Sequence, residues 1–516
     1  MLRPTLLVLC IVTATMLSLA SEAPDNGSPS TVLEQGTFIG KRINSTDAYL
    51  GIRYAEPPVG NRRFRQAAPT KLYHGTYDAT SFGDICPQDT SGANNQSSSD
   101  VYLIPFQTLW FETFPAPTEN SSEDCLSVNV YTPEGTRPGA NLPIVVVRAS
   151  HSTGRAQYLT KSEVVAPASF LYGGGGFVKG EVVVERSIQN RNPVILVSLN
   201  YRLNAVGFLH GKQAKEANIT NLGLRDQREA LRWIQKYIHK FGGDHTKVTL
   251  WVNSGSISAA FQMLTKSGDS EGLFNAAWMQ RGFPIPLNTY ADLQGTYDIL
   301  VNLTSCKGSS DSLDCLRQLP YEELYEAMLT VPSDQRFGRW QVVLDYEFIA
   351  DQPETLLKQN RVARVPFVVG CTEDEGTDGA LNLTTITTEQ DVEFWLSNEG
   401  LPGLPQEQVS QVLALYPSDP AVGSPYGTGD MYAITPQYKR LSSIIGDLEY
   451  HSQRRFFLNE TSHRQHAWSY QSKEFKLPVI GAMDLSDTFN IWGTGDLTDR
   501  LISFVVARKS QQRDRD

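Results

Sequence analysis

The chain has 516 residues, of which 40% are hydrophobic and 20% are charged, and its formal net charge is −11. This is the composition of a globular protein with enough apolar residues for a large core. The acidic balance argues against nucleic acid or an anionic membrane surface as the main partner. No cluster of potential ligands has metal-binding spacing, so neither a metal nor a cofactor is expected.

Residues 1–20, MLRPTLLVLCIVTATMLSLA, have the pattern of a secretory signal peptide. They combine one basic residue, an apolar run and a small-residue end at Ser18-Leu19-Ala20. Such a segment is removed on export, so we expect a mature chain over 21–516 that is secreted and extracellular. No other apolar run is long enough to span a bilayer.

Export also bears on the sequons and the cysteines. If glycosylated, the sequons would lie on surface loops; their asparagines are Asn44, Asn95, Asn120, Asn218, Asn302, Asn382 and Asn459.

Cys10 is removed with the signal peptide, and an oxidising compartment favours pairing of the remaining cysteines. Bridges could close the spans 86–125 and 306–315. Cys371 is left over, and we expect it to be a buried small residue.

Apolar patterning along the chain predicts strands that alternate with helices. Buried strands are predicted at 142–147, 193–203, 248–252 and 366–372, and an amphipathic helix at 225–241. This alternation predicts an α/β fold with a mostly parallel sheet covered on both faces. Such sheets carry their chemistry in the turns at the carboxyl ends of the strands.

Five blocks of sequence then resemble one known family. They are YLGIRYAEPPVGNRRFR (49–65), EDCLSVNVYTP (123–133), VSLNYRLNAVGFL (197–209), NLGLRDQREALRWIQKYIHKFGGD (221–244) and CTEDEG (371–376). Together they resemble type-B carboxylesterases and lipases, the cholinesterase-like branch of the α/β-hydrolase fold. Within this family, the chain is similar to secreted fungal lipases. The resemblance implies one α/β-hydrolase domain over 21–516. It also implies disulfides Cys86–Cys125 and Cys306–Cys315.

In the family's lipases, the loop corresponding to 86–125 resembles a lid over the active site. Here that loop contains VYLIPFQTLWFETF (101–114), which is unusually apolar for a solvated segment. A lid that docks on lipid or hides a pocket needs such a face. A loop packed onto the core would explain the composition equally well.

The nucleophile of this fold is a serine in a G-x-S-x-G turn between a strand and a helix. The glycines permit the tight turn, and the N–H after the serine stabilises the oxyanion. Counted forward from the strand, Ser254 takes the nucleophile position and Gly255 follows it, but Val252 and Ser256 replace the two glycines. Counted backward from the helix, Asn253 takes that position instead. Valine fits poorly where a positive φ is needed, so either register predicts a damaged turn.

The base of the family is a histidine in a pattern resembling G-x-x-H-x-S-D. The matching segment here is GAMDLSDTFNIWG, which places Asp484 at the histidine position. A carboxylate with a pKa of about 3.9 is a much weaker base than an imidazole near 6.5. Glu375 matches the family's acid, and two adjacent carboxylates tend to share a proton. His463 and His466 lie upstream and would need an unusual route to the site.

The oxyanion hole is better preserved than the catalytic residues. YGGGGF (172–177) matches the family's glycine-rich turn and gives Gly175 and Gly176 as N–H donors. In the family this turn follows the preceding strand almost directly, whereas residues 148–170 intervene here. Such an insertion must loop out to be accommodated. The insertion and an early C-terminus also raise the alternative of a faulty gene model.

Three interpretations follow from these features. The first is a secreted carboxylic ester hydrolase relative with weak or absent activity, which would take a small-molecule or lipid ester if active. The second is a non-catalytic binding or adhesion homologue with a protein partner. The third is a gene product without function.

Overall fold

The structure is a computed structural model. It describes residues 27–88, 102–103, 120–149, 178–253, 257–281, 283–332, 340–484, 486–492 and 495–507.

Two sheets organise the described part of the chain. The strands are β1 (Ser30–Leu33), β2 (Gln35–Ile39), β3 (Lys41–Ile43), β4 (Thr46–Arg53), β5 (His74–Asp78), β6 (Ser127–Pro133), β7 (Leu142–Ala149), β8 (Ile195–Leu199), β9 (Gly243–Asn253), β10 (Ala276–Gln280), β11 (Phe367–Thr372) and β12 (Ala467–Ser472). A small sheet has the order β1-β2-β5. The large sheet has the order β12-β11-β10-β9-β7-β8-β6-β4-β3 and is parallel from β12 to β8.

Helices fill the connections between these strands. They are α2 (Gly180–Gln189), α3 (Asn204–Phe208), α4 (Lys212–Glu216), α5 (Leu222–Tyr237), α6 (Ile257–Leu264), α7 (Gln294–Asn302), α8 (Ser312–Gln318), α9 (Tyr321–Thr330), α10 (Pro353–Lys358), α11 (Thr377–Leu381), α12 (Glu389–Trp395), α13 (Gln406–Leu415), α14 (Tyr438–Gly446), α15 (Ser452–Thr461), α16 (Thr488–Trp492) and α17 (Asp496–Ala507). A 3-10 turn, η5 (Ile238–Phe241), follows α5 directly. Within the described ranges, none of these helices is long and apolar enough to cross a membrane.

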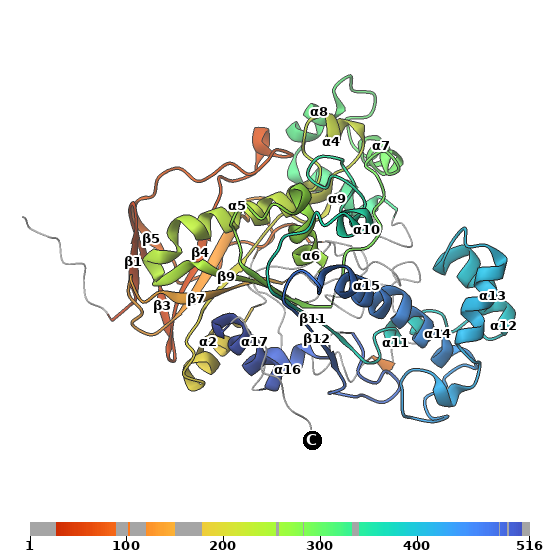
Figure 1. The fold of residues 1–516 in the computed structure, drawn as a ribbon. Coiled ribbons are helices and arrows are strands. Elements are labelled where there is room, and N and C mark those ends of the chain that lie inside the picture. The colour runs from red at the N-terminus through yellow and green to blue at the C-terminus, as the bar shows by residue number, and fades with distance from the viewer. Residues whose placement is uncertain are drawn as a thin grey trace, which may run out of the picture.

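Both faces of the large sheet are covered, as the sequence predicted. In Figure 1, α5 and α6 lie over one face, and α2, α16 and α17 lie over the other. Side chains alternate along the strands. Val146 and Leu250 join the core that contains the apolar side of α5, whereas Val145 and Trp251 join the core that contains α2 and α17. The fold is therefore the α/β-hydrolase architecture that the resemblance implied.

The predicted elements are present, with differences at their ends. The strand expected over 193–203 is shorter, because β8 ends at Leu199 and α3 begins after four intervening residues. The helix expected over 225–241 begins earlier, at Leu222, and ends in η5. β9 extends beyond 248–252 at both ends. β10 was not predicted, because its five buried residues, AAWMQ, have no periodicity that marks a strand.

The cysteine predictions are confirmed. Disulfides join Cys86 to Cys125 and Cys306 to Cys315. Cys371 is free and fully buried. The first bridge closes the span of the predicted lid, of which residues 104–119 lie outside the described part.

The sequons do not all lie on loops, which corrects the expectation. Asn44 lies in the turn between β3 and β4, but Asn302 is the last residue of α7 and Asn459 lies within α15. These three side chains are exposed, whereas Asn218 and Asn382 are half-buried. Asn120 is exposed, and Asn95 lies outside the described residues.

Candidate active site

The connection between β9 and α6 is the strand–turn–helix unit that the sequence predicted. β9 ends at Asn253, α6 begins at Ile257, and the intervening Ser254, Gly255 and Ser256 lie outside the described residues. Asn253 still pairs in register with Gln280 of β10 and with Ala149 of β7.

Val252 therefore belongs to the strand rather than to the turn, which corrects the strain expected there. In β9 it pairs with Met279 of β10. An extended backbone suits a β-branched residue, so no backbone conflict arises at this position. The oxyanion donors expected at Gly175 and Gly176, and residues 150–170 of the insertion, lie outside the described part of the chain.

Glu375 lies at the carboxyl edge of the large sheet, in the turn between β11 and α11. Its side chain is buried, with 1% exposed. One carboxylate oxygen, Oε1, accepts a 2.6 Å hydrogen bond from the Thr372 backbone N–H. The other oxygen, Oε2, is buried and has no hydrogen-bond partner among the described residues. An acid that orients an imidazole would use this second oxygen to accept the ring N–H.

Asp484 is also buried at this edge, and it forms an ion pair. Its Oδ1 accepts a 2.6 Å hydrogen bond from Nη1 of Arg281. The same guanidinium lies 3.5 Å from Asp487 Oδ1 and donates to the Thr488 hydroxyl at 3.3 Å. Asp484, which the family pattern places at the histidine position, is therefore a carboxylate that neutralises the buried cation Arg281.

Arg281 reaches Asp484 because it follows β10 immediately. Its backbone N–H donates to the Gly370 carbonyl of β11 at 2.9 Å, which holds it at the sheet edge. Its φ is +61°, a left-handed conformation that costs a residue with a Cβ roughly 1–2 kcal/mol. The surrounding structure holds this strained backbone in place, and the side chain points into the carboxylate cluster.

Arg281 faces more carboxylates than it can neutralise. Burial disfavours its charged form, but Asp484, Asp487 and Glu375 still carry its pKa above the ordinary value. The pKa of Glu375 is raised well above its usual range, first by burial and then by the charge of Asp484. Burial likewise raises the pKa of Asp484, against the opposing effect of Arg281. The raised pKa values of both groups favour a shared proton between adjacent carboxylates.

The loop that carries Asp484 is held by Asp374, which precedes Glu375 in the chain. Asp374 Oδ1 accepts from the Ser424 hydroxyl at 2.7 Å, and its Oδ2 accepts from the Ala482 N–H at 2.9 Å. Gly481 approaches so closely that an added Cβ would lie 2.3 Å from Asp374 Oδ2, and its φ is +60°. Only glycine suits this position, so the loop is fixed against the acid-bearing turn.

His463 and His466 lie at the wrong edge of the sheet to serve as the base. Both are exposed. The carbonyl of His466 accepts from the N–H of Phe367, the first residue of β11, so His466 lies at the amino ends of the parallel strands. Ser254 follows the carboxyl end of β9. The strand length separates the two edges.

Two other histidines are buried. Nδ1 of His451 lies 3.2 Å from Sγ of Cys371. Burial lowers the pKa of His451 and raises that of Cys371, so this pair is neutral rather than a thiolate and an imidazolium. His210 is fully buried, and its ring lies 5.6 Å from that of Trp340.

Sequence reasoning identified Glu375 and Asp484 but missed Arg281. The sequence did contain a signal for a cation, because Glu375 and Asp484 are two carboxylates at one buried edge, and buried carboxylates require a cation nearby. Arg281 is a basic residue that directly follows the unpredicted strand β10. Among the described residues, no group of three or more histidine, cysteine, aspartate or glutamate side chains is arranged to hold a metal ion.

The sheet order, the strand–turn–helix after β9 and the buried acid after β11 together define an α/β-hydrolase of the esterase type. The carboxylesterase family model matches residues 27–473, and the chain belongs to this family. Among its relatives, Lipase 4 of Diutina rugosa is 34% identical over 89% of this chain and 82% of its own length. The secreted triacylglycerol lipase LIP1 of Gibberella zeae is 31% identical over 90% of this chain and 78% of its own.

A solved structure supports the same fold. The crystal structure of Aspergillus niger EstA matches with a TM-score of 0.72 and 23% identity, and the match covers 93% of this chain and 89% of that one. At this identity, the likeness bears on the fold alone.

Proposed function

We propose that this protein is an exported member of the carboxylesterase family whose ester hydrolysis is weak or absent. The observation that carries the proposal is the buried ion pair between Arg281 and Asp484. It occupies the position where the family pattern has its histidine, while Glu375 keeps a buried oxygen without a partner. Among the described residues, no imidazole donates to that oxygen.

The chemical reason lies in the first step of ester hydrolysis. A serine hydroxyl attacks an acyl carbon only when a positioned base removes its proton. Asp484 is a poor candidate for this base, because Arg281 holds one of its oxygens and the cluster shares protons with Glu375. Loss of triad members typically leaves roughly 10³–10⁴-fold catalysis over water, provided that the oxyanion hole remains intact.

Within this proposal, Ser254 holds the nucleophile position and the segment closed by Cys86–Cys125 covers the site as a lid. The end of β9 at Asn253 supports the forward register, because Ser254 is then the first residue after the strand. Gly175, Gly176 and Gly255 would donate to the oxyanion. The leader-like N-terminus and the secreted relative LIP1 support export, with Asn44 and Asn459 exposed for glycosylation. The triacylglycerol lipase name of that relative supports a lipid ester as the bound molecule.

The alternative is a non-catalytic binding protein on the same scaffold. The buried pair of Arg281 and Asp484 favours this alternative, because it lies where the family pattern has its catalytic histidine. A buried pair of this kind stabilises a fixed arrangement only when its geometry is good, and the 2.6 Å contact meets that condition. In this case the carboxyl edge of the large sheet would present a surface to a partner rather than a reactive group.

An esterase assay on protein from verified cDNA tests the proposal. We expect the purified protein to hydrolyse p-nitrophenyl butyrate and caprylate no faster than the Ser254→Ala variant does. A stable, cooperative fold without turnover supports the binding alternative, and failure to fold or be secreted supports a gene product without function. Weak turnover that Ser254→Ala abolishes still fits the proposal, whereas a kcat of about 1 s⁻¹ or more that depends on Ser254 overturns it. In that case, a His210→Asn variant would show whether His210, a buried histidine, supplies the base.

A further inference from the structure

A cavity of about 120 Å³ lies beside α5, away from the candidate active site. Its lining comes from α5, from the turn η6 (Thr265–Gly268) that follows α6, and from the loops that carry Ala67 and Phe348. α6 begins just beyond the carboxyl end of β9, and its eight residues carry the chain about 12 Å before η6 begins. The cavity is therefore separate from the turn that carries Ser254.

The lining of this cavity is cationic. Arg225, Arg228 and Arg232 recur at spacings of three and four residues, so they lie on one face of α5. Lys266 of η6 adds a fourth cation. Its backbone N–H donates to the Phe348 carbonyl at 2.8 Å, which holds the turn against the loop on the other side. Four basic side chains thus share one small cavity.

Arg225 keeps both of its Nη atoms available to a ligand. Its guanidinium makes a single hydrogen bond to the described residues, from Nε to the Thr220 carbonyl at 3.0 Å. Oδ2 of Asp345 lies 3.7 Å from Nη2, too far for a hydrogen bond, and accepts instead from the Thr220 hydroxyl and from Asn221. Nη2 is buried and has no acceptor among the described residues. The guanidinium lies 4.4 Å from the centre of the Phe348 ring, which fixes the plane of its donors.

The other three cations share two carboxylates. Glu271 contacts all three, namely Arg228 at 3.3 Å, Arg232 at 2.7 Å, and Lys266. Glu229 also lines the cavity, and it pairs with Arg232 at 3.0 Å. In the described part of the chain, no further carboxylate lies within ion-pair distance of these three cations. This side of the cavity therefore keeps a surplus of positive charge.

Arg228 has a second buried donor without an acceptor. Its side chain is 1% exposed, and its Nε has no hydrogen-bond partner among the described residues. A buried donor of this kind calls for a water molecule or an ion. Burial lowers the pKa of both Arg225 and Arg228, and the nearby carboxylates, Asp269 and Glu347 included, do not offset this effect. An anion would offset it, whereas a neutral water molecule would not.

We propose that this cavity binds a phosphate group, either as the free ion or at the end of a monoester. Two phosphate oxygens accept hydrogen bonds from the two Nη atoms of Arg225, in the bidentate geometry that a planar guanidinium favours. The remaining oxygens face the charges of Arg228, Arg232 and Lys266. A carboxylate has only two oxygens, so a bidentate contact with Arg225 would leave it none for the other cations. The cavity is roughly four times the volume of about 30 Å³ that one water molecule occupies, which leaves room for a tetrahedral anion.

The test is isothermal titration calorimetry of the full-length protein with inorganic phosphate at neutral pH. Sodium chloride holds the ionic strength constant, so that nonspecific screening does not change. We expect saturable binding, with acetate binding at least about tenfold more weakly. Arg225→Gln should raise the Kd for phosphate roughly tenfold, the loss of about one charge-assisted contact. Arg225→Lys should raise it as well, because lysine keeps the charge but lacks the two-pronged donor.

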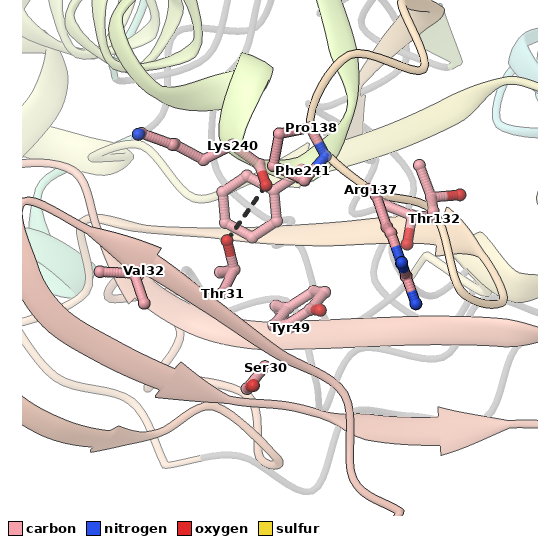
Figure 2. A pocket seen from close by; sticks show the side chains of 10 residues that line it. Ser30, Thr31, Val32, Tyr49, Thr132, Arg137, Pro138, Lys240 and Phe241 are labelled. Atoms are coloured by element: carbon pink, nitrogen blue, oxygen red, sulfur yellow. Dashed lines mark hydrogen bonds between the residues drawn. The ribbon is translucent and has the colours of Figure 1, made fainter. Parts of the chain in front are cut away.

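Arg137→Gln is the matched control, because it removes the same charge at a distant position. Arg137 is exposed and lines a different cavity, beside β1 and η5 (Figure 2). Its substitution should leave the Kd as it is in the wild type. Arg232→Gln provides a second measurement, since the Arg232 side chain is 43% exposed and its removal leaves the core intact. This variant should raise the Kd by a smaller factor than Arg225→Gln, and it decides the question if Arg225→Gln fails to fold.

Glycerol 3-phosphate distinguishes the two sources of the phosphate group. Tighter binding than that of inorganic phosphate assigns the cavity to a monoester, and weaker binding assigns it to the free ion. Three outcomes overturn the proposal. They are the absence of saturable binding by either phosphate compound, equal affinity for phosphate and acetate, and a Kd that Arg137→Gln raises as much as the variants in the cavity do.

Discussion

Two buried arginines, each following a strand of the large sheet, pair with aspartates, and the two pairs differ in how their charges balance. Arg202, which follows β8, meets Asp226 of α5 through Nε and Nη2 at 2.7 and 2.6 Å, and its Nη1 donates to the Arg65 carbonyl. One cation meets one carboxylate. Arg281 instead meets Asp484 through a single nitrogen and shares its charge with Asp487 and Glu375.

This difference separates a structural ion pair from a candidate functional site. The Arg202 pair is bidentate and closed, which is the geometry that makes a buried pair tolerable. The Arg281 cluster retains an acid with an unused oxygen, a raised pKa at both Glu375 and Asp484, and a strained backbone. Strain and perturbed pKa values are features of functional sites, which makes the Arg281 cluster the candidate functional site of the two.

The largest expected effect is on the closed pair. Arg202→Met leaves Asp226 buried without its cation, so the free energy of unfolding should fall by about 3–5 kcal/mol. Denaturant titration measures this change. Lys358→Met, which breaks an exposed pair with Glu354 on α10, is the control and should cost no more than about 0.5 kcal/mol. Equal losses in the two variants would contradict the structural role of Arg202.

Arg281→Met should destabilise the protein less than Arg202→Met does. Its carboxylate partners already have raised pKa values, so they can take up protons when the cation is removed. A buried polar group left in this way costs about 1–3 kcal/mol. The same denaturant titration, repeated at pH 5, should show a smaller loss than at pH 7. A loss that does not change with pH would mean that the carboxylates keep their charges.

The wild-type protein should lose stability as the pH rises. Burial, followed by the charge of Asp484, raises the pKa of Asp378 to about 7, and the pKa of Glu375 is also raised. The native state therefore holds protons that the unfolded chain releases above a pH of about 4. The free energy of unfolding should fall between pH 4 and 7 by up to about 1.4 kcal/mol per pH unit for each proton.

Glu375→Gln tests the source of this pH dependence. Glutamine cannot release a proton, so the slope of stability against pH should become shallower. Glu407→Gln, at an exposed position on α13, should leave the slope as it is in the wild type. A slope that responds equally to both substitutions would locate the effect outside the cluster.

The smallest expected effect concerns the neutral pair at the end of β11. Cys371→Ala removes a buried sulfur that contacts His451, so stability should fall by roughly 1 kcal/mol. The Cys371 thiol should not react with a thiol reagent in the native protein, since burial raises its pKa. Rapid labelling of the folded protein would show that this pair opens to solvent.

Local patterns predicted much of the fold, and the site depended on contacts that such patterns do not contain. Apolar runs located β7, β8, β9 and β11, and the family resemblance supplied the architecture and both disulfides. The family motifs also pointed to Glu375, three residues after β11, and to Asp484, four residues before α16. Arg281 was missed although the two carboxylates called for a cation, because its partner Asp484 lies 203 residues away in sequence.

The most direct test of the lost base is to restore it and remove the cation that has replaced it. The variant Asp484→His with Arg281→Asn supplies an imidazole beside Glu375 and places at position 281 a residue that tolerates a left-handed backbone. The account predicts that this variant hydrolyses p-nitrophenyl butyrate at least about 100-fold faster than the wild type, the lower end of general-base catalysis, and that Ser254→Ala abolishes the gain. A wild-type rate that already depends on Ser254 and does not rise in the variant would contradict it.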